Sequence, residues 1–297
     1  MNWDNTISDF RSYLRLERSM SENTINSYLS DLKKLKLFLS ERGGSDVPDS
    51  DAITSEDLSQ FVESQQSLGI SKRSQARMVS AMRTFYKFLE LEGVVKKNPT
   101  DRIGTPKISR YIPVVLSVDE VDRIISSVDL SDPLGHRNKA ILETLYSCGL
   151  RVSELLELKI SDLFMDESFI RVVGKGNKQR LVPIGELAKD AIVHYLKQSR
   201  RAFSQEDILF LNRRGKKLSR VMVFNIVKVH AEKAGVVKNI SPHTFRHSFA
   251  SHMVENGADL RVVQQMLGHE SILTTEIYTH IDTQKWEEEI LSHHPRG

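Results

Sequence analysis

The sequence has little cysteine and no long apolar run. Its 297 residues include one cysteine, Cys148, which excludes an internal disulfide framework and favours a reducing compartment, so we expect a cytoplasmic protein. No stretch approaches the ~18 uninterrupted apolar residues of a membrane span. Residues 1–5 show no basic region leading into an apolar one, so we expect no secretory signal. Internal repeats and low-complexity segments are missing as well.

The composition is that of a folded protein with two domains. Apolar residues make up 39% of the chain and charged residues 27%, and the length suits two domains at ~100–200 residues each. We expect a helical first domain over residues 1–97 and a mostly helical second domain with a small sheet over residues 114–297. Prolines without any helical or strand period predict an extended linker over residues 98–113.

Local patterns predict the elements of each domain. Apolar residues three and four apart predict helices over 21–43 and 71–93, and Thr54 with Asp57 predicts a capped helix start. In the second domain Ser117 with Glu120 predicts another capped start. The other elements expected in this domain are a hairpin of strands 169–173 and 180–184 around Gly174–Asn177, a short strand over 208–211, and helices over 221–234, from Ser241-Pro242 onward, and over 258–267.

Positive charge is concentrated in the middle of the chain. Residues 171–238 contain 16 basic and 5 acidic residues, whereas residues 1–106 are balanced and residues 270–297 carry a net charge of −4. This distribution predicts a surface that binds a polyanion, with nucleic acid as the leading candidate. An ordinary solubilising surface is the alternative. The candidate DNA contacts are Lys72, Arg73, Arg77, Lys178, Arg180, Arg213, Arg214 and Arg220.

Histidine and arginine side chains in the second domain suit an anionic ligand. His243 and Arg246 lie three apart on one face of a predicted helix, where both can donate to phosphate oxygens. His243 and His247 could instead hold a metal, although no third ligand lies at metal-binding spacing. Arg151 begins an apolar helix and can pair with Glu154 at i+3, either as a structural ion pair or as an anion ligand.

Two further polar positions stand close to turns. Lys175 lies at the predicted hairpin tip, where a lysine can reach into a bound groove but is more often ordinary surface. Tyr278 follows Gly268-His269 by nine residues, and taken alone it would more often be a packing residue than a nucleophile. Neither position carries a functional assignment by itself.

Taken together, these positions indicate a function far more specifically than any one of them does alone. The chain resembles the tyrosine recombinase, or phage integrase, family, whose active-site signature is matched in order by Arg151, Lys175, His243, Arg246, His269 and Tyr278. Three stretches look like the Xer members of that family, and the hairpin and terminal ones favour the XerD branch: residues 174–178, 257–263 and 293–296. The resemblance implies a two-domain clamp around duplex DNA, with a helical core-binding domain and a mixed α/β catalytic domain.

The chemistry of the six positions can be reasoned separately. In-line attack on a phosphodiester builds charge on its non-bridging oxygens, and the cationic residues here can neutralise that charge without a metal or other cofactor. As a hypothesis, Tyr278 attacks phosphorus and forms a 3′-phosphotyrosyl link. Arg151, Arg246 and His269 hold the non-bridging oxygens. Lys175 protonates the leaving 5′-oxygen, and His243 accepts or orients the tyrosine proton.

Partners follow from the resemblance. It implies a homo- or hetero-tetramer on two specific recombination sites, a possible XerC-like paralogue and a possible septal DNA translocase in chromosome segregation, with no membrane partner. Residues 281–292 predict an amphipathic helix that docks on a neighbouring protomer or folds onto its own domain. The alternatives are a type IB topoisomerase-like enzyme, a non-catalytic DNA-binding protein and a metal-dependent integrase or transposase.

Overall fold

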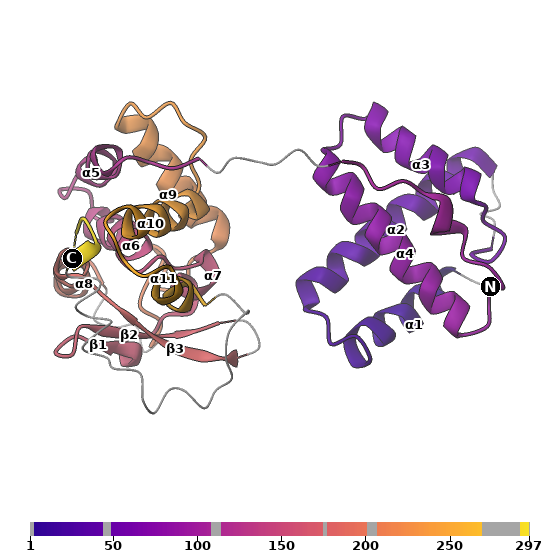
Figure 1. The fold of residues 1–297 in the computed structure, drawn as a ribbon. Helices are drawn as coiled ribbons and strands as arrows, with labels where there is room; N and C mark the ends of the chain where they lie inside the picture. The colour runs from indigo at the N-terminus through magenta and orange to yellow at the C-terminus, as the bar shows by residue number, and fades with distance from the viewer. Residues whose placement is uncertain are drawn as a thin grey trace. The chain divides into compact units, whose positions relative to one another are not determined.

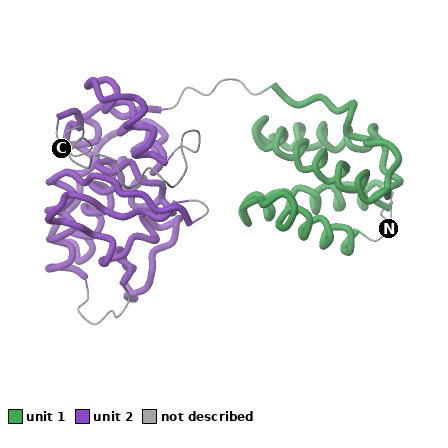
Figure 2. Tube along the Cα trace, turned by 60° about the horizontal axis from the view of Figure 1, so that its bottom comes forward, with its two compact units in different colours: residues 1–111 green, residues 112–297 purple. Residues whose placement is uncertain are grey.

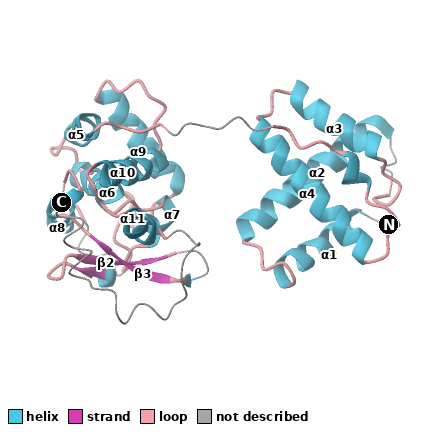
Figure 3. Ribbon diagram, viewed as in Figure 1, coloured by secondary structure: helices cyan, strands magenta, loops and turns pink. Residues whose placement is uncertain are grey.

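The structure is a computed structural model that describes residues 3–43, 49–107, 114–174, 177–200, 207–268 and 292–296. The chain forms two compact units, residues 1–111 and 112–297 (Figure 2). Helices dominate both, and the second unit adds a three-stranded sheet (Figure 3). The predicted mainly helical class with a small sheet is therefore confirmed. Among the helices in these ranges, none is both long and apolar enough to cross a membrane.

The first unit is built from amphipathic helices with polar caps. They are α1 (Trp3–Leu16), α2 (Glu22–Gly43), α3 (Ser55–Ser67) and α4 (Lys72–Leu91) (Figure 1). The predicted capping box is present, since Thr54 Oγ1 accepts from the Asp57 amide at 3.2 Å and Asp57 Oδ2 accepts from the Thr54 amide at 3.0 Å. The Ser71 hydroxyl also caps α4, because it accepts from the Ser74 amide at 3.3 Å. Local sequence thus defines these helix starts.

Aromatic side chains join α1 to α4. The ring of Phe85 stacks on Trp3 with centroids 5.8 Å apart and meets Phe10 edge-on at 5.2 Å. The short helix η1 (Pro99–Arg102) also belongs to this unit, because the Ser55 hydroxyl donates to the Pro99 carbonyl at 2.6 Å and Ile103 is buried. The chain leaves the first unit later than the expected linker start at residue 98.

In the second unit the small sheet lies along one edge of a group of helices (Figure 1). These are α5 (Val118–Ser126), α6 (Gly135–Ser147), α7 (Val152–Glu157), η2 (Ile160–Asp162), α8 (Glu186–Gln198), α9 (Arg220–Lys233), α10 (Pro242–Glu255) and α11 (Leu260–Leu267). The strands are β1 (Leu163–Phe164), β2 (Phe169–Val173) and β3 (Gln179–Pro183). Strands β2 and β3 pair antiparallel from Phe169–Pro183 to Val173–Gln179, which confirms the predicted hairpin.

One predicted strand does not form. Residues 208–211 make only isolated bridges, Ile208 with Lys159 and Leu211 with Lys217. The segment changes its partner after a single pair because the chain turns back at once, with the Gly215 amide donating to the Asn212 carbonyl at 2.9 Å. An apolar run of four residues indicated burial here, and Leu209 and Phe210 are indeed buried.

Helix α6 lies at the centre of the second core. Almost every residue from Ala140 to Ser147 on it is fully buried, including Glu143 and Tyr146. It packs on α8 and α10, with α10 beside it in Figure 1. Helix α10 contributes Phe249 and Met253 to the same core. These two helices lead directly to the residues that the sequence singled out.

Candidate active site

A tight turn after α6 places Arg151. Gly149 adopts φ +56°, and a Cβ there would lie 2.5 Å from the Phe249 ring, so only glycine fits. Arg151 then caps α7 in an extended conformation. Its amide donates to Glu154 Oε2 at 2.9 Å and its Nη1 donates to Glu154 Oε1 at 2.9 Å. The predicted i+3 pair is confirmed.

Helix α10 supplies Arg246 from its buried face. Ser241 and Pro242 start the helix as predicted. Arg246 Nη1 donates to the Gly149 carbonyl at 2.7 Å, and its Nη2 donates to the Leu267 carbonyl at 2.5 Å. The guanidinium also lies 3.8 Å from Glu154. Arg246 therefore ties together the α6–α7 turn, α10 and the end of α11.

Strand β3 adds a third arginine. Arg180 makes a two-point ion pair with Glu154 at 2.9 and 3.0 Å, and its Nε donates to the Met266 carbonyl at 2.8 Å. A Cβ on Gly268, which has φ +66°, would lie 3.2 Å from this guanidinium. We expected Arg180 to contact DNA, and the structure corrects this, because its side chain is only 7% exposed and its donors face protein groups.

The three arginines surround the carboxylate of Glu154, which accepts hydrogen bonds from Arg151 and Arg180 and forms an ion pair with Arg246 at 3.8 Å, and they bind three consecutive carbonyls, a set we call the arginine clamp. Arg180 donates to the carbonyl of Met266, Arg246 to that of Leu267, and Arg151 to that of Gly268, the last at 3.1 Å. Carbonyls in the last turn of a helix lack partners within the helix and carry its negative dipole end. The clamp therefore satisfies the end of α11 with cationic donors, immediately before residue 269.

Glu154 is the hub of the arginine clamp. Its side chain is 2% exposed, and burial alone would raise the pKa of its carboxyl. Hydrogen bonds and charge from Arg180 and Arg151 outweigh that effect and hold the pKa below its ordinary value. Burial and the charge of Arg151 lower the pKa of Arg246 to about 10, so it stays cationic at neutral pH. Three guanidiniums against one carboxylate leave net positive charge for an anion.

His243 lies one turn before Arg246 on α10. Partial burial is the largest cause that lowers the pKa of its imidazole, followed by the charges of His247, Arg246 and Arg151. A neutral imidazole at neutral pH can accept a proton. The metal alternative for His243 and His247 gains no support, because within the described ranges no group of three His, Cys, Asp or Glu side chains could hold an ion.

Three of the six expected site residues lie outside the described residues: Lys175, His269 and Tyr278. The same is true of the expected helix over 281–292, apart from its last residue. The structure does describe the flanks of these positions. Gly174 and Lys178 close the hairpin with a 2.7 Å backbone hydrogen bond, and Gly268 ends α11.

The candidate DNA contacts fall into two groups. Six are exposed: Lys72, Arg73, Lys178, Arg213, Arg214 and Arg220. Arg77, by contrast, lies 2.7 Å from the buried carboxylate of Asp31 and donates to the Ser27 carbonyl. Burial raises the pKa of Asp31 and the charge of Arg77 opposes this, so Arg77 serves the interior of the first unit as a counter-ion. The side chain of Arg77 is still 38% exposed, so its expected DNA contact stays a prediction beside this internal role.

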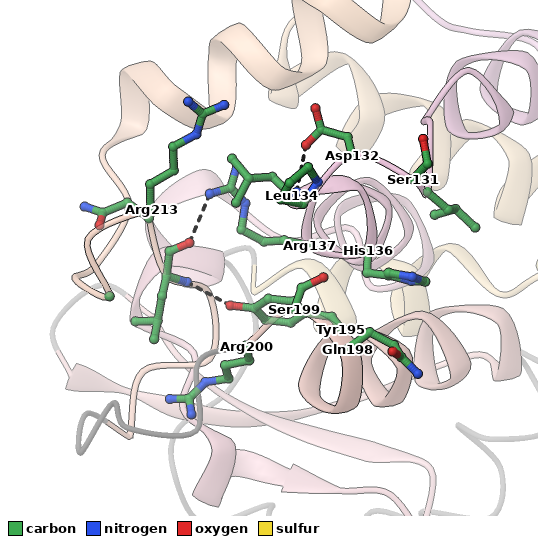
Figure 4. A pocket seen from close by; sticks show the side chains of 15 residues that line it. Ser131, Asp132, Leu134, His136, Arg137, Tyr195, Gln198, Ser199, Arg200 and Arg213 are labelled. Atoms are coloured by element: carbon green, nitrogen blue, oxygen red, sulfur yellow. Dashed lines mark hydrogen bonds between the residues drawn. The ribbon is translucent and has the colours of Figure 1, made fainter.

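One cavity of the second unit has no residue of the arginine clamp in its lining. It has a volume of about 740 Å³ and is lined by the start of α6 and the end of α8, with Arg137, Tyr195 and Arg213 among its side chains (Figure 4). Arg137 is buried and donates to the Leu211 carbonyl at 3.1 Å, while the Leu211 amide donates to the Tyr195 hydroxyl at 3.1 Å. These contacts hold the 211–215 turn in place, and no clamp residue lines the cavity.

Comparisons with known proteins agree with this arrangement. Residues 114–285 match the Phage integrase family, and residues 7–93 match its N-terminal SAM-like domain. The tyrosine recombinase XerD of Chlorobaculum tepidum is 46% identical over 301 residues, covering 99% of this chain and 98% of its own. The chain belongs to the phage integrase family.

Solved structures of such recombinases share the fold. A XerA recombinase is 33% identical with a TM-score of 0.51 and 99% of each chain covered. A lambda integrase dimer bound to a COC′ core site is 18% identical with a TM-score of 0.72, covering 95% of this chain and 98% of that one. The family match and the 46% identical XerD relative identify the chain as a tyrosine recombinase of the XerD type, a DNA strand-exchange enzyme.

The sequence did not predict that Glu154 pairs with three arginines in this recombinase. It paired Glu154 with Arg151 alone and left Arg180 on the surface. One signal was available, since Glu154 is followed by Leu155 and Leu156 in a helix with few polar residues, where a buried acid needs a counter-ion and hydrogen bonds. The link from Arg180 to Glu154 spans 26 residues and a hairpin, and no local pattern reveals it.

Proposed function

We propose that this recombinase cuts and rejoins duplex DNA at a specific site through a 3′-phosphotyrosyl link at Tyr278. The observation that carries the proposal is the arginine clamp. It brings Arg151 and Arg246 onto one carboxylate at the end of α11, and Gly268 lies ten residues before Tyr278. A preorganised pair of guanidiniums close to a tyrosine-bearing segment suits stabilisation of a phosphorane-like transition state.

The clamp leaves donors for a phosphate. A guanidinium has five N–H groups, and the named contacts of Arg151 use one hydrogen on each terminal nitrogen. The Arg151 side chain is 35% exposed, so part of it faces solvent, where a phosphate can approach. Arg246 is more deeply buried than Arg151 and adds positive charge on the interior side of the proposed phosphate site. Arg180 orients the other two through Glu154.

In the proposed reaction one bond to phosphorus forms as another breaks, and each proton has a donor or an acceptor. The Tyr278 hydroxyl attacks phosphorus while its proton passes to His243 or to water beside it. The bond from phosphorus to the 5′-oxygen breaks, and Lys175 gives that oxygen a proton. His269 adds a hydrogen bond to a non-bridging oxygen. A 5′-hydroxyl of a partner strand then reverses the sequence, so strand exchange needs no ATP.

We assign the biological role by analogy with the relatives. A XerD relative of nearly equal length and a lambda integrase dimer seated on a core site support a duplex DNA partner and assembly of several protomers. We propose that the chain works in the cytoplasm as a tetramer on two sites, resolves chromosome dimers during segregation, and acts with a XerC-like paralogue under a septal DNA translocase.

Mapping the DNA-linked peptide tests the reaction. A suicide duplex, nicked near the candidate site, should trap a covalent product whose tryptic peptide 262–285 carries the DNA, because Tyr278 is its only tyrosine. Chelator should leave the yield unchanged. Tight binding without any covalent product would favour a DNA-binding protein, and relaxation of a plasmid without a recombination site would favour a topoisomerase-like enzyme.

The pH dependence of cleavage should show His243 as the proton acceptor. Because its pKa lies below the ordinary 6.5, the imidazole is neutral at pH 7–8 and the rate should be flat there. As the pH falls through the lowered pKa, the base is protonated and the rate should drop roughly tenfold per pH unit. Single-turnover cleavage from pH 5 to 8 measures this. The His243→Gln variant should be slower and lose the acid limb, and an unchanged limb would contradict the assignment.

A further inference from the structure

The cavity at the start of α6 is lined mainly by positive charge, and we call it the α6 cavity. Its lining holds three arginines and one carboxylate, that of Asp132 (Figure 4). The arginines come from three different segments: Arg137 on α6, Arg200 after α8 and Arg213 in the 211–215 turn. The volume of about 740 Å³ falls within the ~300–1,000 Å³ of ligand sites in proteins. The cavity therefore has room for a ligand, and its charge favours an anion.

Arg137 is buried in this lining without a carboxylate partner. It is only 3% exposed. Its Nη1 donates to the Leu211 carbonyl at 3.1 Å, and its Nε and Nη2 donate to Asn138 Oδ1 at 3.2 and 2.8 Å. These acceptors are neutral, and Arg137 forms no ion pair with any carboxylate of the described residues. Because buried charges are normally paired, the guanidinium lacks the counter-ion that its burial requires.

Arg213 brings a second positive charge to the same cavity. Its side chain is exposed and makes no hydrogen bond or ion pair with another described residue. Burial is the largest cause that lowers the pKa of Arg137, and the charge of Arg213 lowers it further, against opposing effects of Tyr195 and Asp132. The two guanidiniums thus repel each other. An anion in contact with both would relieve this repulsion.

The first turn of α6 adds a helix start to the lining. The helix begins at Gly135, and no side chain caps it. The first N–H groups of a helix lack partners within the helix and carry the positive end of its dipole, so they favour an anion. Leu134 and His136 of this turn line the cavity with Arg137. The carboxylate of Asp132 is partly used here, since its Oδ1 accepts from the Leu134 amide at 2.7 Å.

We propose that the α6 cavity binds a phosphate group, with Arg137 and Arg213 as its cationic ligands. The three contacts of Arg137 use one hydrogen on each nitrogen, which leaves one hydrogen on each terminal nitrogen for the ligand. Guanidiniums bind phosphate oxygens through two such hydrogens at once. The rest of the cavity accommodates the organic part of a phosphate ester. This group belongs either to a free nucleotide or to the DNA backbone outside the cleavage site.

The test titrates sodium pyrophosphate into the full-length chain without divalent ions, against sodium chloride of equal ionic strength. The key variant is Arg213→Gln, because this exposed side chain can be changed without disturbing the interior. Arg214→Gln is the matched control, since Arg214 is exposed in the same turn but does not line the cavity. Arg151→Gln removes the partly exposed arginine of the clamp, the other place where the probe could bind. Calorimetry gives each dissociation constant, and Tm shows that each variant is folded.

The Arg213→Gln variant should bind pyrophosphate roughly 10- to 100-fold more weakly than the wild type, the cost of losing a charged hydrogen bond. Arg214→Gln and Arg151→Gln should stay within about twofold. At ten times its dissociation constant, pyrophosphate should raise the Tm of the wild type by ~3–6 °C. The proposal fails if the wild type does not bind the probe, if Arg213→Gln and Arg214→Gln weaken binding equally, or if only Arg151→Gln weakens it.

Duplex binding then identifies the source of the phosphate. If the cavity takes a backbone phosphate, pyrophosphate should weaken duplex binding by the wild type more than by Arg213→Gln. If it takes a free phosphate ester, pyrophosphate should affect duplex binding no more than sodium chloride does, and ATP should displace the probe from the cavity. The site does not depend on Tyr278. A chain that binds pyrophosphate here but forms no covalent DNA product would overturn the proposed function and support this inference.

Discussion

Substituting Tyr278 by phenylalanine should abolish the covalent protein–DNA product and leave DNA binding within about twofold of the wild type. The change removes one oxygen, the atom that is proposed to bond to phosphorus. The phenylalanine ring that remains has no other nucleophilic atom. Removing a nucleophile of this kind costs at least ~10⁴-fold in rate. The measurement is denaturing gel analysis of a suicide duplex together with fluorescence anisotropy for binding.

The control for this substitution is Tyr28→Phe in the first unit, where the tyrosine is partly buried on α2 and packs against the core. It removes the same atom from a different tyrosine and should cleave at the wild-type rate. A covalent product in the Tyr278→Phe protein, at any yield above background, would show that another residue attacks the phosphate.

Replacing Glu154 by alanine should have the second largest effect. The substitution leaves Arg180 and Arg246 buried without their shared counter-ion, and breaking a buried pair costs about 3–5 kcal/mol. The arginine clamp then loses its geometry, so cleavage should fall roughly 10²–10³-fold, the cost of losing a preorganised charge contact. Denaturant unfolding gives the first quantity and single-turnover cleavage the second.

Glu157→Ala is the matched control, because Glu157 lies at the end of the same helix in an exposed pair with Lys217. It should cost less than ~1 kcal/mol. The pH dependence supplies a second check. The folded pKa of Glu154 is below its ordinary value of 4.5, so its stabilisation is complete above that pH and is lost as the pH falls through the folded pKa. A stability gap between wild type and Glu154→Gln that did not shrink in acid would contradict the hub role.

Much of the fold could be read from local patterns. The capping pairs Thr54–Asp57 and Ser117–Glu120 and the Ser241-Pro242 start act over three or four residues, and the structure has each of them, as it has the predicted antiparallel pairing of β2 with β3. The predicted strand over 208–211 did not form, because a run of apolar residues reports burial and does not specify a pairing partner.

The site was less visible from the sequence. The pattern placed Arg151 beside Glu154 because three residues on one helix turn determine that contact. Whether an arginine faces solvent or the interior depends on partners far along the chain. Arg180 binds Glu154 and Met266, and Arg77 pairs with Asp31. These partners lie too far apart in the chain for a local sequence pattern to predict the contacts. Charge counting therefore could not reveal that Arg180 is buried or that Arg77 pairs with a buried carboxylate.

The arginine clamp holds α11 through main-chain oxygens, and this has a consequence for how the segment can vary. Carbonyls of Met266, Leu267 and Gly268 are the same for every amino acid, so the three bonds do not depend on which side chains occupy the first two positions. They depend on spacing. Inserting or deleting one residue within this turn would offset all three donor–acceptor matches at once, so these hydrogen bonds are more sensitive to the length of the segment than to its side chains.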